Sequence, residues 1–198
     1  MAISPVAIEI QSNIAVLYID NPPVNALSQS VRQGIVEQIQ EANNNPDVQA
    51  IVLACRGKTF IAGADISEFG KPPLEPHLPD VLSNIYNSKK PVIAAIFGTV
   101  LGGGFETALA CHFRVAKKGT KVGLPEVNLG LIPGAGGTQM LPRVTGIETA
   151  LDMITSGKPR PVETLQSSGL SPELSSGICD LIVDSNEIDA AIAFAQDI

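Results

Sequence analysis

The chain of 198 residues is poor in the residue types on which several classes of protein depend. It has three cysteines, far apart and in no CxxC pattern, and two histidines without HxxxH spacing. Neither a disulfide framework nor a zinc site is therefore expected to organise the fold, and a reducing compartment is the natural setting. We expect no metal ion.

Basic residues are also scarce, with 13 lysines and arginines against 20 acidic residues and a net charge of −7. This balance argues against nucleic acid or an anionic membrane surface as the main partner. No apolar run approaches the roughly 18 residues that cross a membrane, and the N-terminus lacks the basic start of a signal peptide. We expect a cytoplasmic protein, with the peroxisome as the alternative if a targeting signal lies in a C-terminal continuation of the chain.

Short apolar segments alternate with segments of helical periodicity, which indicates a layered α/β fold with largely parallel strands. The length predicts a single domain, residues 1–198. The expected strands lie at 6–10, 14–19, 50–54, 91–96, 113–116 and 178–183. The expected helices lie at 29–42 (with Ser28 as N-cap), 78–87, 138–144, 147–156, 162–167 and 188–196.

Two glutamates stand in apolar, glycine-rich surroundings. Glu106 follows three glycines and opens a short helical run, and Glu126 follows Pro125 ahead of another glycine-rich loop. A carboxylate is costly to hold there unless it is paired or its chemistry needs the setting. The pattern predicts that the two carboxyls act together as a general acid and a general base. The alternatives are a glutamate stabilised by the helix dipole at 106 and a loop carboxylate capping a neighbouring N–H at 126.

The loops at 56–65 and 98–106 each follow an expected buried strand, and ligands gather at the carboxyl ends of parallel strands. Glycines let the backbone come close to a ligand. The N–H groups of Ala64 and Gly103 are predicted to form an oxyanion hole, each donor worth about 3 kcal/mol in a transition state. The GAGGT segment at 134–138 is not followed by GK[ST], so it is no P-loop; we expect a helix N-terminus there.

Four segments in order resemble the crotonase superfamily, the enoyl-CoA hydratases and isomerases. They are NPPVNALS (21–28), KTFIAGADISEF (58–69), KPVIAAIFGTVLGGGFETALACHFRVA (90–116) and VGLPEVNLGLIPGAGGTQMLPRVTG (122–146). The details are most similar to the hydratase/isomerase part of multifunctional β-oxidation enzymes, where it is fused to a 3-hydroxyacyl-CoA dehydrogenase. The resemblance implies a crotonase (ClpP-like) fold of repeated ββα units without the usual C-terminal helical segment. It thus implies an excised N-terminal domain whose oligomeric state is open, because that segment builds the trimer in relatives.

The resemblance also implies roles for individual residues. Ala64 and Gly103 match the donors that hold the thioester oxygen. Glu106 and Glu126 match the pair that activates water, with Glu126 exchanging a proton at C2 of the substrate, and Asp65 matches a structural residue of the 62–66 turn. The segments that cradle pantetheine and adenine in relatives contain Ala26, Leu27, Lys58, Phe60, Ala62 and Ile66.

The implied activity is hydration of 2-trans-enoyl-CoA to 3-hydroxyacyl-CoA in fatty-acid β-oxidation. The implied partner is the acyl-CoA substrate, and no cofactor is expected because CoA is part of that substrate. Two alternatives stay open: Δ3–Δ2 enoyl-CoA isomerisation at the same site, and a non-catalytic acyl-CoA-binding or scaffold module. The length of the acyl chain is left undetermined, since loops such as 70–80 are expected to form its pocket.

Overall fold

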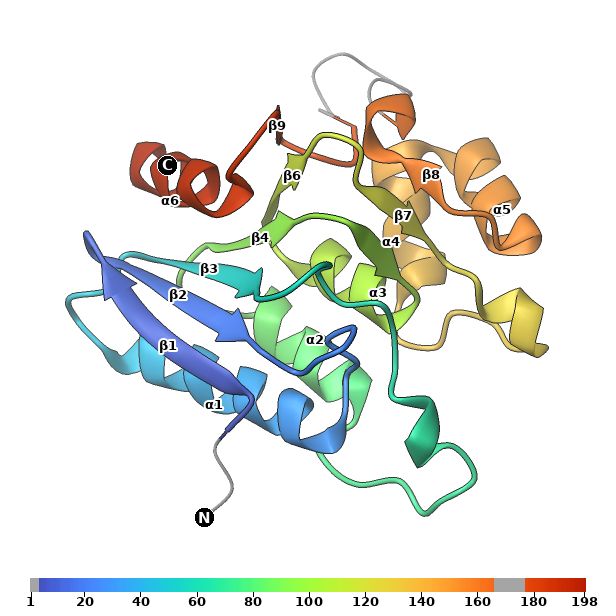
Figure 1. The fold of residues 1–198 in the computed structure, drawn as a ribbon, viewed down its shortest axis with the longest axis horizontal. Coiled ribbons are helices and arrows are strands. Elements are labelled where there is room, and N and C mark those ends of the chain that lie inside the picture. Colours follow the sequence, from blue (N-terminus) through green and yellow to red (C-terminus); the bar gives the residue numbers. More distant parts are fainter. Residues whose placement is uncertain (1–3, 166–176) are drawn as a thin grey trace.

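The computed structural model describes residues 4–165 and 177–198, and one large sheet forms its centre (Figure 1). Within these residues the sheet has six strands. The first pair is antiparallel, and every later neighbour is parallel, as predicted. In spatial order the strands are β1 (Val6–Gln11), β2 (Ile14–Ile19), β3 (Ala50–Cys55), β4 (Val92–Ile96), β6 (Phe113–Lys117) and β9 (Leu181–Val183).

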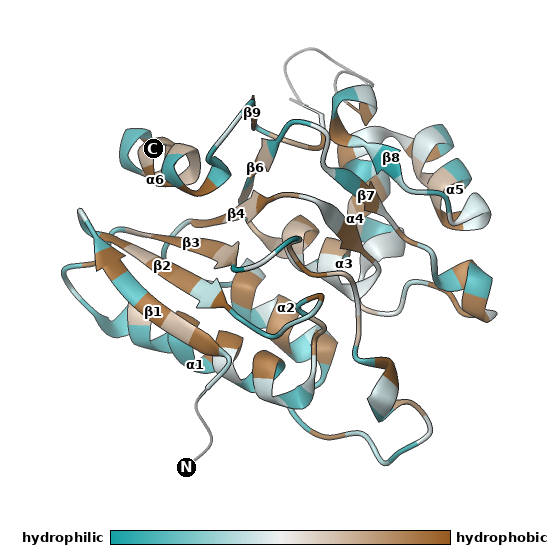
Figure 2. Ribbon diagram, viewed as in Figure 1, coloured by the Kyte–Doolittle hydropathy of each residue, from teal (hydrophilic) through white to brown (hydrophobic). Residues whose placement is uncertain are grey.

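Helices cover both faces of this sheet, which explains why its central strands are apolar without alternation. On one face lie α1 (Gln29–Asn44), α2 (Leu78–Tyr86) and α3 (Gly103–Ala110); α6 (Glu187–Asp197) packs on the other. The Ser28 side chain caps α1, as predicted, by accepting a hydrogen bond from the Val31 N–H. Figure 2 shows the brown, apolar side of α1 turned toward the sheet. No helix among the described residues is long and apolar enough to span a membrane.

A small second sheet stands beside the large one and was not predicted. In the described part of the chain it consists of β5 (Thr99–Leu101), β7 (Lys121–Gly123) and β8 (Arg160–Pro161). Strands this short, set between glycines, leave no periodic pattern in the sequence. Since β5 follows β4 and β7 follows β6, each leading to a helix, the chain repeats the expected ββα unit. The helices α4 (Gly137–Thr145) and α5 (Ile147–Ser156) complete this side (Figure 1).

Two predicted elements differ near the C-terminal end. The helix predicted at 162–167 begins as a 3₁₀ turn, η3 (Val162–Leu165), and its last two residues lie outside the described ranges. The strand predicted at 178–183 spans Leu181–Val183 alone. The Ile178 carbonyl oxygen accepts a hydrogen bond from Nε of the buried Arg114 (2.7 Å). This carbonyl is thus bound to a side chain, whereas in a strand it would pair with the backbone of a neighbouring strand.

Gly104 allows α3 to lie directly against the loop after β3. A Cβ atom at this position would stand 2.1 Å from the carbonyl oxygen of Ile61, a backbone atom that cannot turn aside. We expect Gly104→Ala to lower the free energy of unfolding by about 3 kcal/mol, the upper range for overpacking. Denaturant titration measures this.

Gly134→Ala is the matched control for Gly104→Ala. Its added Cβ would meet just the Ile132 carbonyl oxygen, at an ordinary 3.9 Å, so the free energy of unfolding should change by no more than about 0.5 kcal/mol. Equal midpoints for the two variants would show that the close approach at Gly104 is not important for stability.

Candidate active site

The two predicted backbone donors lie side by side, where the loop after β3 meets the start of α3. The Leu27 N–H donates to the Gly63 carbonyl oxygen (2.9 Å) within a parallel bridge between Leu27 and Ala64. Because the C=O and N–H of a trans peptide point in opposite directions, the Ala64 N–H points away from Leu27. The Ala64 nitrogen is 3.9 Å from where a Cβ on Gly103 would stand.

The Gly103 N–H is free of the helix that it begins. Gly103 is the first residue of α3, and the first N–H groups of a helix have no acceptor within it. The Gly102 carbonyl oxygen accepts from the Glu106 N–H (2.9 Å), so the neighbouring Gly103 N–H points out of the helix start. A left-handed φ of 50° at Gly102 produces this sharp entry into the helix.

Glu106 lies in the first turn of α3 and is almost fully buried, with 2% of its surface exposed. Its Oε1 accepts hydrogen bonds from the N–H groups of Ala135 (2.9 Å) and Gly137 (2.8 Å). Burial raises the pKa of this carboxyl, and the two N–H donors counteract part of the rise. The glycine-rich segment that precedes α4 is therefore a helix N-terminus, as predicted, and it holds Glu106.

Glu126 opens the 3₁₀ turn η2 (Glu126–Leu129) and is half-buried. Its Oε1 lies 3.1 Å from where a Cβ on Gly102 would stand. Its Oε2 is buried and has no hydrogen-bond partner within residues 4–165 and 177–198. Burial raises the pKa of Glu126, its own backbone N–H opposes this, and the charge of Glu106 raises the pKa further. The two carboxyls are thus close enough to influence each other's titration.

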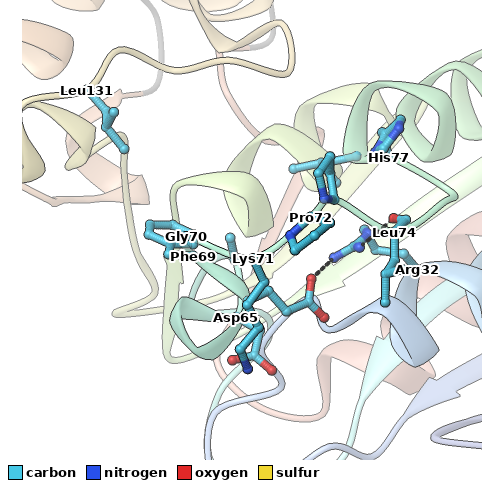
Figure 3. Close-up of a pocket in the computed structure, with 13 residues that line it drawn as sticks. Arg32, Asp65, Phe69, Gly70, Lys71, Pro72, Leu74, His77 and Leu131 are labelled. Carbon is cyan, nitrogen blue, oxygen red and sulfur yellow. Dashed lines mark hydrogen bonds and ion pairs between the residues drawn. The ribbon is translucent and has the colours of Figure 1, made fainter.

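Ala64, Gly103 and Glu126 line one pocket of about 150 Å³, whereas Glu106 is not among its lining residues. Two larger pockets adjoin it, and Ala64 lines them as well. One, of about 410 Å³, follows residues 21–24. The other, of about 500 Å³, is lined by residues that include Phe69, Leu74 and Leu131, which Figure 3 labels. Ala64 therefore stands at the junction of a branched cleft, and Gly103 lines its smallest branch.

The residues expected to cradle CoA differ in where the structure places them. Ala26, Ala62 and Ile66 line the pocket along 21–24, and Leu27 bridges to Ala64, another residue of that lining. Lys58 is exposed in the loop after β3. Phe60 is different: its side chain is 0% exposed and belongs to the core, and its N–H donates to the Phe97 carbonyl oxygen. Phe60 therefore offers a ligand no side-chain surface.

Asp65 has the structural place that the resemblance implied. Its carboxylate caps the 3₁₀ turn η1 (Ile66–Glu68) by accepting a hydrogen bond from the Ser67 N–H (2.9 Å). Hydrogen bonds from Ser67 lower the pKa of Asp65, as do the nearby charges of Lys71 and Arg32. The Asp65 carboxylate therefore stabilises the turn that directly follows Ala64.

Asn25 is a buried residue of the site that was not singled out from the sequence. Its Nδ2 donates to the carbonyl oxygens of Arg56 (2.8 Å) and Thr59 (2.9 Å), and its Oδ1 accepts from the Asn21 N–H. Asn25 thereby joins the loop along 21–27 to the loop after β3. The sequence feature that could have indicated Asn25 is an asparagine directly after Pro-Pro-Val. Asparagine tolerates a left-handed backbone, and Asn25 has a φ of 53°.

Comparison with known proteins shows the family to which the chain belongs. The sequence profile of the enoyl-CoA hydratase/isomerase family matches residues 9–181, and the chain belongs to this family. It is 43% identical over 186 residues to the peroxisomal bifunctional enzyme of Danio rerio, covering 94% of this chain and 25% of that protein. It is 41% identical over 161 residues to a probable enoyl-CoA hydratase of Bacillus subtilis, covering 78% of this chain and 62% of that protein.

The fold also matches solved structures. The enoyl-CoA hydratase of Bacillus anthracis superposes with a TM-score of 0.87 at 28% identity, covering 98% of this chain and 76% of that one. The predicted crotonase fold is therefore confirmed. The chain spans about a quarter of the length of the bifunctional relatives.

Proposed function

We propose that this chain hydrates 2-trans-enoyl-CoA to 3-hydroxyacyl-CoA. The observation that carries the proposal is the buried Oε2 of Glu126, which has no hydrogen-bond partner among the described residues and belongs to a pocket that Ala64 and Gly103 also line. A buried carboxylate oxygen without a partner is costly, and a ligand that supplies or accepts a proton would relieve that cost.

The backbone donors suit the charge that this reaction develops. When water adds to C3, negative charge collects on the thioester oxygen as an enolate. Donors held in place before the reaction stabilise this charge more than the neutral substrate, which is the condition for catalysis. The free N-terminal end of α3 adds a favourable dipole at the same point.

The two carboxyls suit the two proton transfers. The Glu106 carboxylate, kept ionised in part by the Ala135 and Gly137 N–H groups, takes a proton from water as the water oxygen bonds to C3. Glu126, whose pKa the Glu106 charge raises, delivers its proton to C2. One proton of water stays in the new 3-hydroxyl group. The other passes from Glu106 to Glu126 and restores the starting state of both carboxyls.

The branches of the cleft suggest how the rest of the substrate lies. We place the CoA moiety along residues 21–24, and the acyl chain under the apolar wall of Phe69, Leu74 and Leu131. This chemistry uses no metal or redox cofactor, and CoA enters as part of the substrate. The names of two relatives, a peroxisomal bifunctional enzyme and a peroxisomal fatty acid β-oxidation multifunctional protein, support a second activity in a longer chain and the peroxisomal alternative for location.

Isomerisation of 3-enoyl-CoA is the second candidate, because moving one proton between C2 and C4 needs a single carboxyl and Glu126 lines the pocket. Incubating the purified protein with crotonyl-CoA tests the first proposal by the loss of the enoyl-thioester absorbance, and 3-hexenoyl-CoA tests the second. We expect hydration, unchanged after treatment with a chelator. Tight binding of CoA esters without turnover of either thioester would instead support the non-catalytic module.

A further inference from the structure

Arg32 is a buried cation of α1 that none of the predicted roles includes. Its side chain is 10% exposed. The guanidinium donates to the carbonyl oxygens of Leu27 (2.7 Å), Leu74 (3.1 Å) and Pro76 (2.8 Å), and to Oε2 of Glu68 (2.9 Å). A buried guanidinium is costly unless its donors are satisfied, and these acceptors come from three separate segments.

Glu68 and Arg32 form an ion pair, here called the clasp, between α1 and residues 66–76. Part of that segment lines the pocket of about 500 Å³ in which we place the acyl chain. The second oxygen of Glu68, Oε1, accepts from the N–H of Gln29 (2.6 Å), at the start of α1. The dashed line in Figure 3 marks the ion pair, with Phe69, Pro72 and Leu74 around the same pocket. The clasp therefore holds residues 66–76 to α1, which begins two residues after Leu27, the residue that bridges to Ala64.

The wall held by this clasp has little packing of its own. Phe69 and Leu74 line the pocket, yet 52% and 61% of their surfaces are exposed. One further link to α1 is the hydrogen bond from Nε2 of Gln29 to the Glu75 carbonyl oxygen (2.8 Å). A loop with so few buried contacts takes its position from its polar anchors.

We propose that Arg32 is a positioning residue that sets the preference for acyl-chain length. The inference rests on the proposed placement of the acyl chain. Arg32 acts by holding Phe69 and Leu74 as a wall, not by contact with the thioester, because its donors face backbone carbonyls and Glu68. A short chain ends near Ala64, whereas a long chain extends along the wall and gains affinity with each buried methylene.

Calorimetric binding of butyryl-CoA and decanoyl-CoA to the purified chain tests this inference independently of turnover. Each methylene removed from water is worth about fourfold in affinity, so a wall that no longer covers two of them costs about 15-fold. We expect Arg32→Met to lose about 15-fold of its affinity for decanoyl-CoA and less than about threefold for butyryl-CoA. Arg32→Lys, which restores the charge but not the fork of donors, should lie between.

Two further variants guard against a trivial result. Glu68→Gln leaves Arg32 in place and weakens the clasp, so it should shift the ratio of the decanoyl-CoA and butyryl-CoA affinities in the same direction as Arg32→Met. It keeps the inference testable if Arg32→Met does not fold. Arg56→Met makes the same chemical change at an exposed ion pair with Glu9 and should leave the ratio unchanged.

Equal losses for both thioesters, or no loss in the folded variants, would overturn the role of Arg32. So would a wild-type protein that binds decanoyl-CoA no more tightly than butyryl-CoA. Failure of the proposed function looks different: the wild-type protein would bind the longer thioester more tightly, with the predicted response to Arg32→Met, and yet hydrate neither crotonyl-CoA nor 2-decenoyl-CoA.

Discussion

Replacing Glu126 with glutamine should lower kcat/KM for the hydration of crotonyl-CoA by about 10³-fold, within the range for general acid–base groups. Glutamine keeps the shape of the side chain but has no proton to deliver to C2. Isomerisation of 3-hexenoyl-CoA should fall by a similar factor, since the same group moves the proton in that reaction. Steady-state rates with both thioesters measure the effect.

The loss in Glu126→Gln should not come from unfolding. Burial raises the pKa of Glu126 in the folded protein, so this group favours the folded state fully below its unfolded pKa and loses that contribution as pH rises through the folded pKa. At neutral pH the neutral glutamine should therefore leave the melting temperature equal or higher. Glu148→Gln, on the exposed start of α5, is the matched control and should keep full activity. Undiminished hydration by Glu126→Gln would refute the mechanism.

Replacing Glu106 with glutamine should lower hydration by about 10²-fold or more while sparing much of the isomerisation. The amide still accepts hydrogen bonds from Ala135 and Gly137, but it no longer takes a proton from water. Hydration needs this transfer, whereas a shift of one proton between C2 and C4 needs a single carboxyl. The ratio of the two rates is therefore the sharpest measure that separates the roles of Glu106 and Glu126.

The pH profile gives a second test of the Glu106 variant. The proposed mechanism requires ionised Glu106 and protonated Glu126, so the wild-type rate should fall on both sides of an optimum. The charge of Glu106 raises the pKa of Glu126, and glutamine removes that charge. The alkaline limb of the remaining activity should consequently move to lower pH. An alkaline limb at the wild-type position would show that the two carboxyls do not interact.

The elements that could be predicted are those whose cause is local. The apolar run at Ala50–Cys55 is wholly buried as a central strand, and Ser28 caps α1 where the helical pattern begins. Family membership could also be inferred, because ordered motifs such as GADISEF and LPEVNLG survive in the sequence whatever their place in space. The short strands β5, β7 and β8 could not, since two or three residues carry no period.

The sequence by itself determined the layered α/β fold, the helix starts and the two glutamates worth testing, because spacing, capping and glycine conformation act over a few residues. The tertiary structure alone decided which groups meet. It placed Glu106 against the Gly137 N–H, 31 positions away, and Arg32 against Glu68, 36 positions away, and it buried Phe60 in the core. Contacts over such separations depend on the order of the strands and the path of the loops, which no local pattern specifies.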